Sequence, residues 1–224
     1  MADFDQILRT TFAGRRFTDE PVTDEDVAAV LDVARFASSG GNRQPWRVVA
    51  IRDEQTKRAV LDCGTEALRR YAAQQRAGES PYNTVVPSRV SDTDVAAVPD
   101  DAVAWYVGLA AAPVLLVIGV ELRLVASFDA GLDRVGVASG ASIYPFVHNV
   151  LLAARARGLT GVLTTFAIAG EATVRELVAL PASVAVAAVV PLGHPAKVIT
   201  KLTREPVAEF ARWESWRGVP VAGP

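Results

Sequence analysis

The sequence predicts one α/β domain in which helices alternate with the strands of a mixed sheet. Three short segments, 47–52, 113–120 and 184–190, are rich in the β-branched residues that favour strands. Between them lie stretches with apolar residues three and four positions apart, as in amphipathic helices. The 224 residues suit one medium domain and contain no internal repeat or linker. We therefore expect residues 1–224 to form a single unit with helices packed on a sheet.

The composition excludes several function classes. Half of the residues are hydrophobic, 21% are charged and the net charge is −2, so we expect neither nucleic acid nor an anionic membrane as a partner. The longest apolar run, 109–120, is interrupted by Pro113 and Gly119 and is short of the ~20 residues of a membrane helix. Residues 1–9 lack the pattern of a secretion signal, which predicts a cytoplasmic protein. The single Cys63 excludes an intramolecular disulfide.

The N-terminal third begins with two predicted helices. The first covers 3–10, and residues 10–17 break its pattern. Thr23 and Asp26 have the spacing of a capping box, which predicts that the second helix begins there. Its apolar face carries the residues Val27, Val30, Leu31 and Ala34.

The loop 34–46 joins this helix to the first strand and is the most unusual stretch of the chain. It contains two glycines, whose bare backbone lets main-chain N–H and C=O groups approach a ligand. Its amides are both donors and acceptors of hydrogen bonds. The loop could wrap a flat polar ligand or could be an ordinary helix-to-strand connection. Its polar members are Ser38, Ser39, Asn42 and Gln44, beside Gly40 and Gly41.

A long irregular segment follows the next predicted helix, 53–76. Residues 77–101 are rich in Gly, Pro, Ser, Asn and Asp and show little periodicity. A stretch of this length without secondary structure is usually either a functional lid or disordered. We favour a lid over the site, with a flexible insertion as the alternative.

The second half of the chain contains two more predicted helices. Residues 139–157 form the longest helix, which begins nearer Tyr144 because Pro145 is tolerated only in a first turn. Gly158 suits the position that ends it. Residues 161–166 are a strand or an extended loop, 171–180 a short helix, and the polar tail 193–210 runs along a surface.

Common catalytic and cofactor motifs are absent from the sequence. His148 and His194 are the only histidines and lie far apart, so neither a hydrolytic triad nor a metal site is indicated. Neither a Walker loop nor a Gly-x-Gly-x-x-Gly turn occurs. Four basic residues could each hold a phosphate or could be ordinary surface charges, namely Arg15, Arg16, Lys201 and Arg204.

Four motifs in the same order resemble the flavin-dependent nitroreductase family. Residues 39–46, Ser-Gly-Gly-Asn-Arg-Gln-Pro-Trp, are similar to its signature P-S-(A/G)-G-N-x-Q-P-W. Residues 16–22 resemble its N-terminal R-x-F-x-x-x-P-V motif, and 149–159 its central N-x-x-L-A-A-x-x-x-G-L helix. Residues 191–196 and 204–207 resemble its C-terminal motif.

The resemblance implies an α+β fold, built as a three-layer α/β/α sandwich with a mixed sheet, and an intertwined homodimer with one FMN at each of two interface sites. Arg15 or Arg16 would hold the phosphate together with Lys201 and Arg204. Where the family has Arg-Arg-Ser or Arg-His-Ser before its first motif, this chain has Thr10-Thr11-Phe12-Ala13, so Thr11 or Arg15 would replace those contacts. Ser39, Gly41, Asn42 and Gln44 would line the ribityl chain and ring, and Gly161, Leu163, Thr164 and Thr165 would pack near the ring.

The implied activity is reduction of nitroaromatic or quinone-type acceptors by a ping-pong mechanism. NADPH or NADH would give a hydride to FMN, and no catalytic side chain is required because the flavin carries the chemistry. The alternatives are a related flavin reaction, such as dehalogenation or deazaflavin-linked reduction, and a flavin-binding protein with little turnover. Residues of the lid region would decide among acceptors, in particular Tyr82, Arg89, Trp105 and Tyr106.

Overall fold

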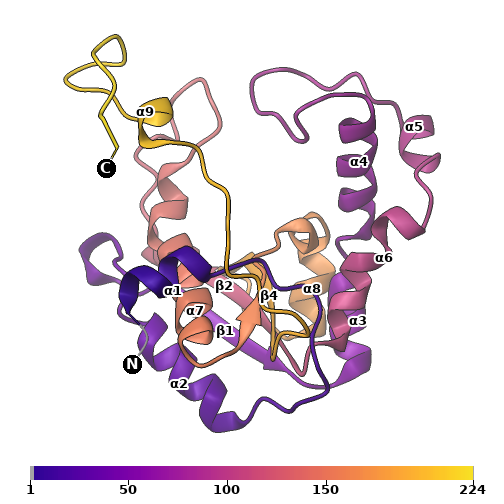
Figure 1. Cartoon of the computed structure of the whole chain (residues 1–224). Helices are drawn as coiled ribbons and strands as arrows, with labels where there is room; N and C mark the ends of the chain where they lie inside the picture. The colour runs from indigo at the N-terminus through magenta and orange to yellow at the C-terminus, as the bar shows by residue number, and fades with distance from the viewer. Residues whose placement is uncertain (1–2, 224) are drawn as a thin grey trace.

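A four-stranded antiparallel sheet forms the centre of the protein in a computed structural model that describes residues 3–223 (Figure 1). The strand order is β1-β2-β4-β3, with β1 Trp46–Ile51, β2 Val114–Glu121, β4 Val184–Gly193 and β3 Thr160–Gly161. Val117 of β2 lies opposite Val49 of β1 on one side and Val189 of β4 on the other. All eight residues of β2 are buried, as expected for a central strand covered on both faces.

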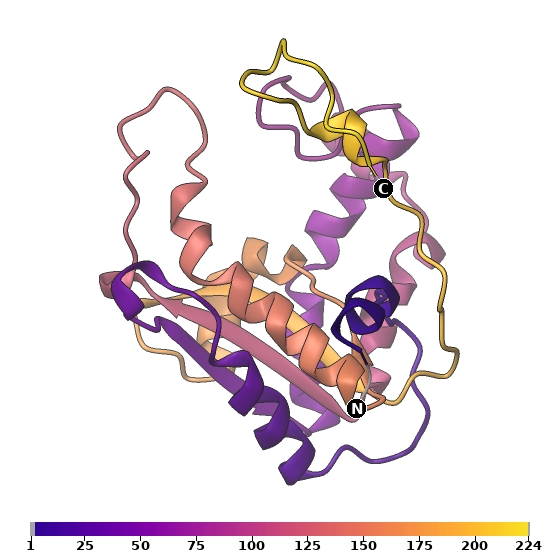
Figure 2. The same ribbon diagram turned by 60° about the vertical axis from the view of Figure 1, so that its left-hand side comes forward.

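Helices cover both faces of the sheet, so the α+β class and the three layers are confirmed (Figure 2). On one face, α2 and α7 pack against each other and against the sheet, and Trp46 stacks on Phe146 with ring centroids 4.9 Å apart. On the other face, the buried side chains come mainly from α3, α4, α6 and α8. The helices are α1 Phe4–Thr10, α2 Asp24–Ala34, α3 Glu54–Asp62, α4 Thr65–Arg76, α5 Asp92–Ala96, α6 Asp101–Val107, α7 Tyr144–Ala156, α8 Glu171–Leu177 and α9 Val207–Phe210.

Local signals at the helix ends are confirmed. Thr23 and Asp26 form the predicted capping box, in which each side chain accepts a hydrogen bond from the other residue's backbone N–H. The helix α7 begins at Tyr144, with Pro145 in its first turn. Gly158 has φ = 77°, the left-handed conformation that ends helices and that glycine adopts at least cost.

The predicted mixed sheet needs correction. Every pair among the four strands is antiparallel, and in residues 3–223 the parallel pairing is confined to an isolated bridge between Ala13 and Gly161. Helices between strands indicated parallel crossovers. Here α3 to α6 connect β1 to the antiparallel β2, and α8 connects β3 to the antiparallel β4. The strands joined by α7, β2 and β3, do run in the same direction, but β4 lies between them. The alternation alone therefore could not define the strand directions.

The predicted helix 53–76 is two helices, because the chain bends at Gly64. A Cβ at position 64 would lie 2.6 Å from the Tyr106 hydroxyl and 2.7 Å from the Ala167 nitrogen, so only glycine lets the bend sit against these groups. Other boundaries also differ. Residues 77–101 include α5, residues 108–111 form a 3₁₀ turn before β2, and α8 ends at Leu177 rather than at residue 180.

Three segments project from the same end of the molecule in both ribbon views (Figures 1 and 2). They are the loop after α4 (77–91), the loop 122–137 and the C-terminal segment 198–223. Their tips expose large apolar side chains, among them Phe128, which is 94% exposed, and Trp216, which is 73% exposed. Exposed apolar groups gathered on projecting segments are typical of surfaces that contact a partner.

Candidate functional site

The first part of the site is a strap, residues 11–18, which carries Arg15 and Arg16 between two anchor points. At one end the Gly14 N–H donates to the Gly161 carbonyl at 2.9 Å. At the other end the Thr18 N–H donates to the His194 carbonyl at 2.9 Å, and the Ala196 N–H donates to the Arg16 carbonyl at 3.1 Å. The strap is therefore fixed to the body of the protein on both sides of the two arginines.

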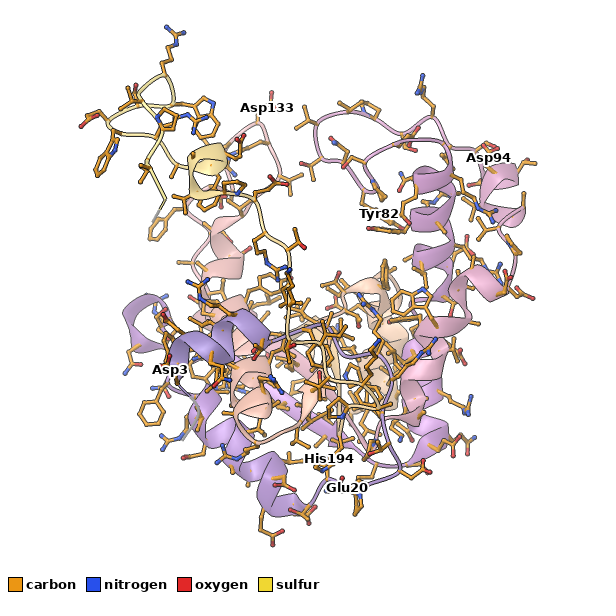
Figure 3. The ribbon with its side chains drawn as sticks, in the orientation of Figure 1. Asp3, Glu20, Tyr82, Asp94, Asp133 and His194 are labelled. Carbon is orange, nitrogen blue, oxygen red and sulfur yellow. The ribbon has the colours of Figure 1, made fainter. Side chains whose placement is uncertain are left out.

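A pair of side chains lies at the second anchor, at the end of the molecule away from the projecting segments (Figure 3). The His194 Nε2 atom lies 3.5 Å from Glu20 Oε1. This contact connects Glu20, two residues after the strap, to His194, whose carbonyl accepts the hydrogen bond of Thr18. The contact therefore adds a second link at this end of the strap that carries Arg15 and Arg16.

Gly14 brings the strap unusually close to β3. A Cβ at this position would lie 2.2 Å from Thr160 Oγ1 and 2.3 Å from Thr160 Cγ2, and both residues are buried. Any larger residue at position 14 would have to push the strap away from Thr160. Glycine here therefore sets the position of the neighbouring Arg15.

Arg15 lies at a hollow of about 240 Å³ that also contains Leu163 and Thr164. The Arg15 guanidinium stacks over the Trp105 ring at 5.3 Å, and none of the ion pairs in residues 3–223 includes Arg15. Its charge is therefore available to an anion. The hollow is lined further by Leu68, Tyr71, Ala72, Gln75, Ala102, Trp105, Val162 and Phe166.

The segment 163–165 has an open backbone edge beside this hollow, which Leu163 and Thr164 line. The Thr164 N–H donates to the Val189 carbonyl at 3.0 Å, and the Val189 N–H donates to the Thr164 carbonyl at 2.9 Å. Successive N–H groups of an extended chain point in opposite directions, so those of Leu163 and Thr165 point away from β4. Neither group donates to another protein atom in the described part of the chain. The edge can therefore hydrogen-bond a flat ligand.

Tyr106 packs behind Phe166 and does not itself line the hollow. Its side chain is fully buried, and burial raises the pKa of its phenol to about 12, so it stays protonated at neutral pH. Its ring packs edge to face with that of Phe166, with centroids 5.5 Å apart. Tyr106 therefore supports Phe166, which lines the hollow, and adds no charge there.

The signature loop 39–44 is built differently. Gly41, Asn42 and Gln44 have φ values of 62°, 52° and 48°, a left-handed conformation that is uncommon outside glycine. The Gln44 N–H donates to Ser39 Oγ at 3.0 Å, and the Gly40 N–H donates to Ser142 Oγ at 3.1 Å. The amides of Asn42 and Gln44 are exposed, so they are available to a ligand.

The loop does not meet the Arg15 hollow within one chain. It precedes Trp46, which lies opposite Val120 and, through it, Ala185, whereas Thr164 lies beside Val189. The two positions are thus three strand spacings and four residues apart, about 14 Å across the sheet and about 13 Å along it. None of the hydrogen bonds in residues 3–223 joins the loop to 163–165.

The other predicted phosphate residues lie apart from the hollow as well. Lys201 and Arg204 are exposed in the extended tail, and the Arg204 side chain donates only to the neighbouring Thr203 carbonyl. Arg16 is exposed beside Arg15, and the Thr11 hydroxyl donates to the Ile7 carbonyl at 2.7 Å. Their roles toward a phosphate stay predictions.

Two contributors to the hollow were not predicted from the sequence. Tyr71 lies in a regular helical pattern and Phe166 at the end of an extended segment, so each was interpreted only as part of its element. Their ring centroids lie 5.5 Å apart at 83°, edge to face. Two aromatic residues that flank a predicted site from separate elements give no signal in sequence spacing, because their proximity is created by the fold.

Comparison with known proteins identifies the family of the chain. The sequence model of the nitroreductase family matches residues 9–194, which include the strap, the signature loop and the 163–165 edge. The chain belongs to the nitroreductase family. It does so over most of its length, which confirms the resemblance carried by the four motifs.

Individual members of the nitroreductase family that resemble the chain differ in activity. It is 28% identical to 5,6-dimethylbenzimidazole synthase of Rhodospirillum rubrum, over 92% of this chain and 87% of that protein. It is 38% identical to a nitrobenzene nitroreductase of Ectopseudomonas oleovorans over 65 residues, 29% of this chain and 28% of that one. The crystal structure of oxidised iodotyrosine deiodinase bound to FMN and 3-iodo-L-tyrosine has a TM-score of 0.67 at 23% identity, covering 96% of this chain and 100% of that one.

Two further properties of the described residues bear on function. None of the helices in 3–223 combines the length and apolar character needed to cross a bilayer. The same residues contain no group of three or more His, Cys, Asp or Glu side chains placed to ligate a metal ion.

Proposed function

We propose that this chain is an FMN-dependent oxidoreductase that takes a hydride from NAD(P)H and reduces a flat, electron-poor acceptor such as a nitroarene or a quinone. The observation that carries the proposal is the open backbone edge 163–165 beside the uncompensated charge of Arg15. A flavin mononucleotide has both complementary parts, a planar ring with hydrogen-bonding edges and a phosphate dianion.

The residues of the hollow fit such a group. Arg15 lacks a carboxylate partner within residues 3–223 and would neutralise the phosphate. The N–H groups of Leu163 and Thr165 would donate to acceptor atoms at the ring edge. Tyr71 and Phe166 would exclude water from the reacting face. Bound FMN would supply the redox chemistry, accepting a hydride and passing two electrons to the acceptor.

A homodimer is part of the proposal, because each chain carries two separated half sites. The exposed amides of Asn42 and Gln44 on one chain would complete the Arg15 hollow of a second chain. The apolar tips of the projecting segments support such an association, since burying Phe128 and Trp216 against a partner would remove them from water. Lys201 and Arg204 would approach a phosphate in the same assembly.

The proposal predicts a specific optical behaviour of the purified protein. Protein loaded with FMN should show the visible bands of oxidised flavin, lose them on anaerobic addition of NADPH, and regain them when a nitroarene or a quinone is added. A protein that cannot be reconstituted with FMN would overturn the proposal.

The same experiment separates the alternatives. Bands that persist after both NADPH and NADH would leave two alternatives, a flavin-binding protein with little turnover and deazaflavin-linked reduction. Bands that bleach but recover with neither acceptor would indicate a related flavin reaction, such as dehalogenation. Recovery in alternating steps, with the nicotinamide gone before the acceptor is added, would be consistent with a ping-pong mechanism.

A further inference from the structure

A second hollow, of about 330 Å³, adjoins the Arg15 hollow because Tyr71 and Phe166 line both. Its walls come from α4, from the loop after α4 and from the start of the segment that leads into α8. We refer to it as the aromatic slot. It is lined by Ala67, Tyr71, Tyr82, Thr165, Phe166 and Ala169.

The aromatic slot contains no charged side chain. Its polar groups are hydroxyls, and the Tyr82 hydroxyl already donates to the Ala67 carbonyl at 3.0 Å. Burial raises the pKa of Tyr82, so its phenol stays neutral. A ligand in the slot therefore meets rings, methyl groups and neutral oxygens.

The guanidinium groups of Arg69 and Arg70 on α4 already form ion pairs with carboxylates. Arg70 lies 2.6 Å from Asp92, and Arg69 contacts Asp100 and donates to the Val98 carbonyl at 2.8 Å. An anionic ligand would have to compete with these carboxylates for either arginine. An uncharged ligand would leave both pairs intact.

Tyr82 is held over the slot in a strained conformation. Its φ is 51°, which is rare for a bulky residue and usually occurs where the surroundings enforce it. Two contacts hold it, the hydroxyl bond to Ala67 and a bond from its backbone N–H to Oε1 of the buried Gln74 at 3.0 Å. Figure 3 shows the Tyr82 side chain beside α4. Both ends of the residue are therefore fixed, and the ring keeps one position.

We propose that the aromatic slot is the acceptor subsite, that it selects uncharged flat molecules of one or two rings, and that Tyr82 is the residue that sets this selection. The inference rests on the proposed function, because the slot adjoins the hollow assigned to FMN. Tyr82 would pack against the acceptor ring opposite Phe166, and an acceptor that carries a charge would bind without a counter-charge.

The test measures binding of three para-substituted nitrobenzenes that share the ring and the nitro group and carry no charge, a negative charge and a positive charge. 4-Nitrotoluene, 4-nitrobenzoate and 4-nitrobenzylammonium are dialysed to equilibrium against the protein, with and without FMN, and the dissociation constants are compared. Neutral 4-nitrotoluene should bind at least about 10-fold more tightly than either ion, since an unpaired charge in an apolar site is disfavoured. Tyr82→Ala should weaken its binding about 3- to 10-fold, the loss expected for one aromatic contact.

Two variants make the result specific. Tyr82→Phe keeps the ring and removes the hydroxyl bond, so it should lie between wild type and Tyr82→Ala. Val85→Ala, in the same loop at a residue that is 85% exposed and does not line the slot, is the matched control and should bind like wild type. Equal binding by Tyr82→Ala and Val85→Ala would overturn the role of Tyr82. Tighter binding of 4-nitrobenzoate, abolished by Arg70→Ala, would overturn the preference for neutral acceptors.

Failure of this inference can be distinguished from failure of the proposed function. FMN binding and bleaching by NADPH are recorded on the same samples. If both are retained while the three acceptors bind equally, only the subsite is wrong. If FMN does not bind, the proposed function fails, and dialysis of flavin-free Arg15→Ala, which lacks the free charge of the adjoining hollow, still reports whether the slot prefers the neutral ring.

Discussion

The two halves of the predicted flavin site differ in what holds them in place. The strap with Arg15 and the 163–165 edge are fixed by hydrogen bonds to β3, β4 and residues 194–196 of the same chain. The signature loop 39–44 is held mainly by hydrogen bonds within itself, including one from Gln44 Nε2 to Asn42 Oδ1 at 3.3 Å, and by the bond from the Gly40 N–H to Ser142 Oγ. Asn42 and Gln44 are exposed and have left-handed φ values. The half site with Arg15 is organised within the chain and needs no partner to form. The exposed amides of Asn42 and Gln44 would be used only on binding a ligand or a partner chain.

The largest effect should come from breaking the organised half at Gly14. Gly14→Ala would place a Cβ 2.2 Å from Thr160 Oγ1 and displace the strap. We expect a free energy of unfolding lower by about 1–3 kcal/mol, as for other overpacked sites. We expect FMN binding to weaken by at least as much as on loss of Arg15 itself, because the displaced strap carries Arg15 away from the hollow.

Urea unfolding and a fluorescence titration with FMN measure these two quantities. Gly108→Ala is the control, since a Cβ there meets no atom within 4 Å. If the two variants bound FMN equally well, Gly14 would not position the strap.

The next effect should come from Arg15→Ala. Losing a charged hydrogen bond weakens binding by roughly 1.5–3 kcal/mol, which is about 10- to 150-fold. Because Arg15 is assigned to the phosphate, FMN should lose this affinity while riboflavin, which has no phosphate, should bind within about 2-fold of wild type.

Isothermal titration with both flavins decides the assignment. Arg58→Ala is a suitable control, because Arg58 is paired on the surface with Glu54 at 2.7 Å. Equal losses for FMN and riboflavin would show that Arg15 supports the ring or the fold and not the phosphate.

A smaller, pH-dependent effect is expected in the loop 122–137, one of the three projecting segments. Asp129 Oδ2 accepts hydrogen bonds from the Val137 and Ala138 N–H groups, at 2.6 and 3.1 Å, and from Arg134 at 2.9 Å. These bonds, that of Val137 first, lower the pKa of Asp129 from 3.8 to about 2. Since the pKa is lower in the folded state, the stabilisation is complete above about pH 4 and is lost as the pH falls toward 2.

Pepsin, which is active at low pH, should therefore cleave this loop faster as the pH falls from 4 to 2. In Asp129→Asn, which cannot ionise, cleavage should already be fast at pH 4 and should change less with pH. A wild-type loop with the same pH profile as Asp129→Asn would contradict the role assigned to this carboxylate.

Much of the fold could be predicted because its signals are local. The capping box of Thr23 and Asp26 and the left-handed Gly158 are set by residues a few positions apart. The break at Gly64 could not be predicted, since the groups that require glycine there, the Tyr106 hydroxyl and the Ala167 nitrogen, are distant in sequence. Strand direction was missed for the same reason, because pairing partners are chosen by the fold as a whole.

In the candidate site, too, residues marked by local motifs could be predicted, and residues brought together only by the fold could not. Arg15, Leu163 and Thr164 were predicted from motifs and do lie at one hollow. Tyr71 and Phe166 were missed because nothing in their local sequence marks them. The remaining predicted residues, in the strap, the signature loop, the tail and at Thr165, do not line this hollow, so their roles stay predictions until the proposed assembly is tested.

Subunit complementation tests most directly whether one flavin site is built from two chains. Arg15→Ala removes one half site, and the double change Asn42→Gly with Gln44→Gly removes the amides of the other while glycine keeps the left-handed φ. In a mixed dimer one site would carry every change and the other none. With random pairing, about a quarter of all sites would be intact.

The two variants are co-expressed, and tight FMN sites are counted by titration against each variant alone. Recovery of about a quarter of the sites in the mixture, with almost none in either variant alone, is the predicted result. No recovery in mixtures that contain confirmed heterodimers would contradict the account, because both half sites would then have to serve the same chain.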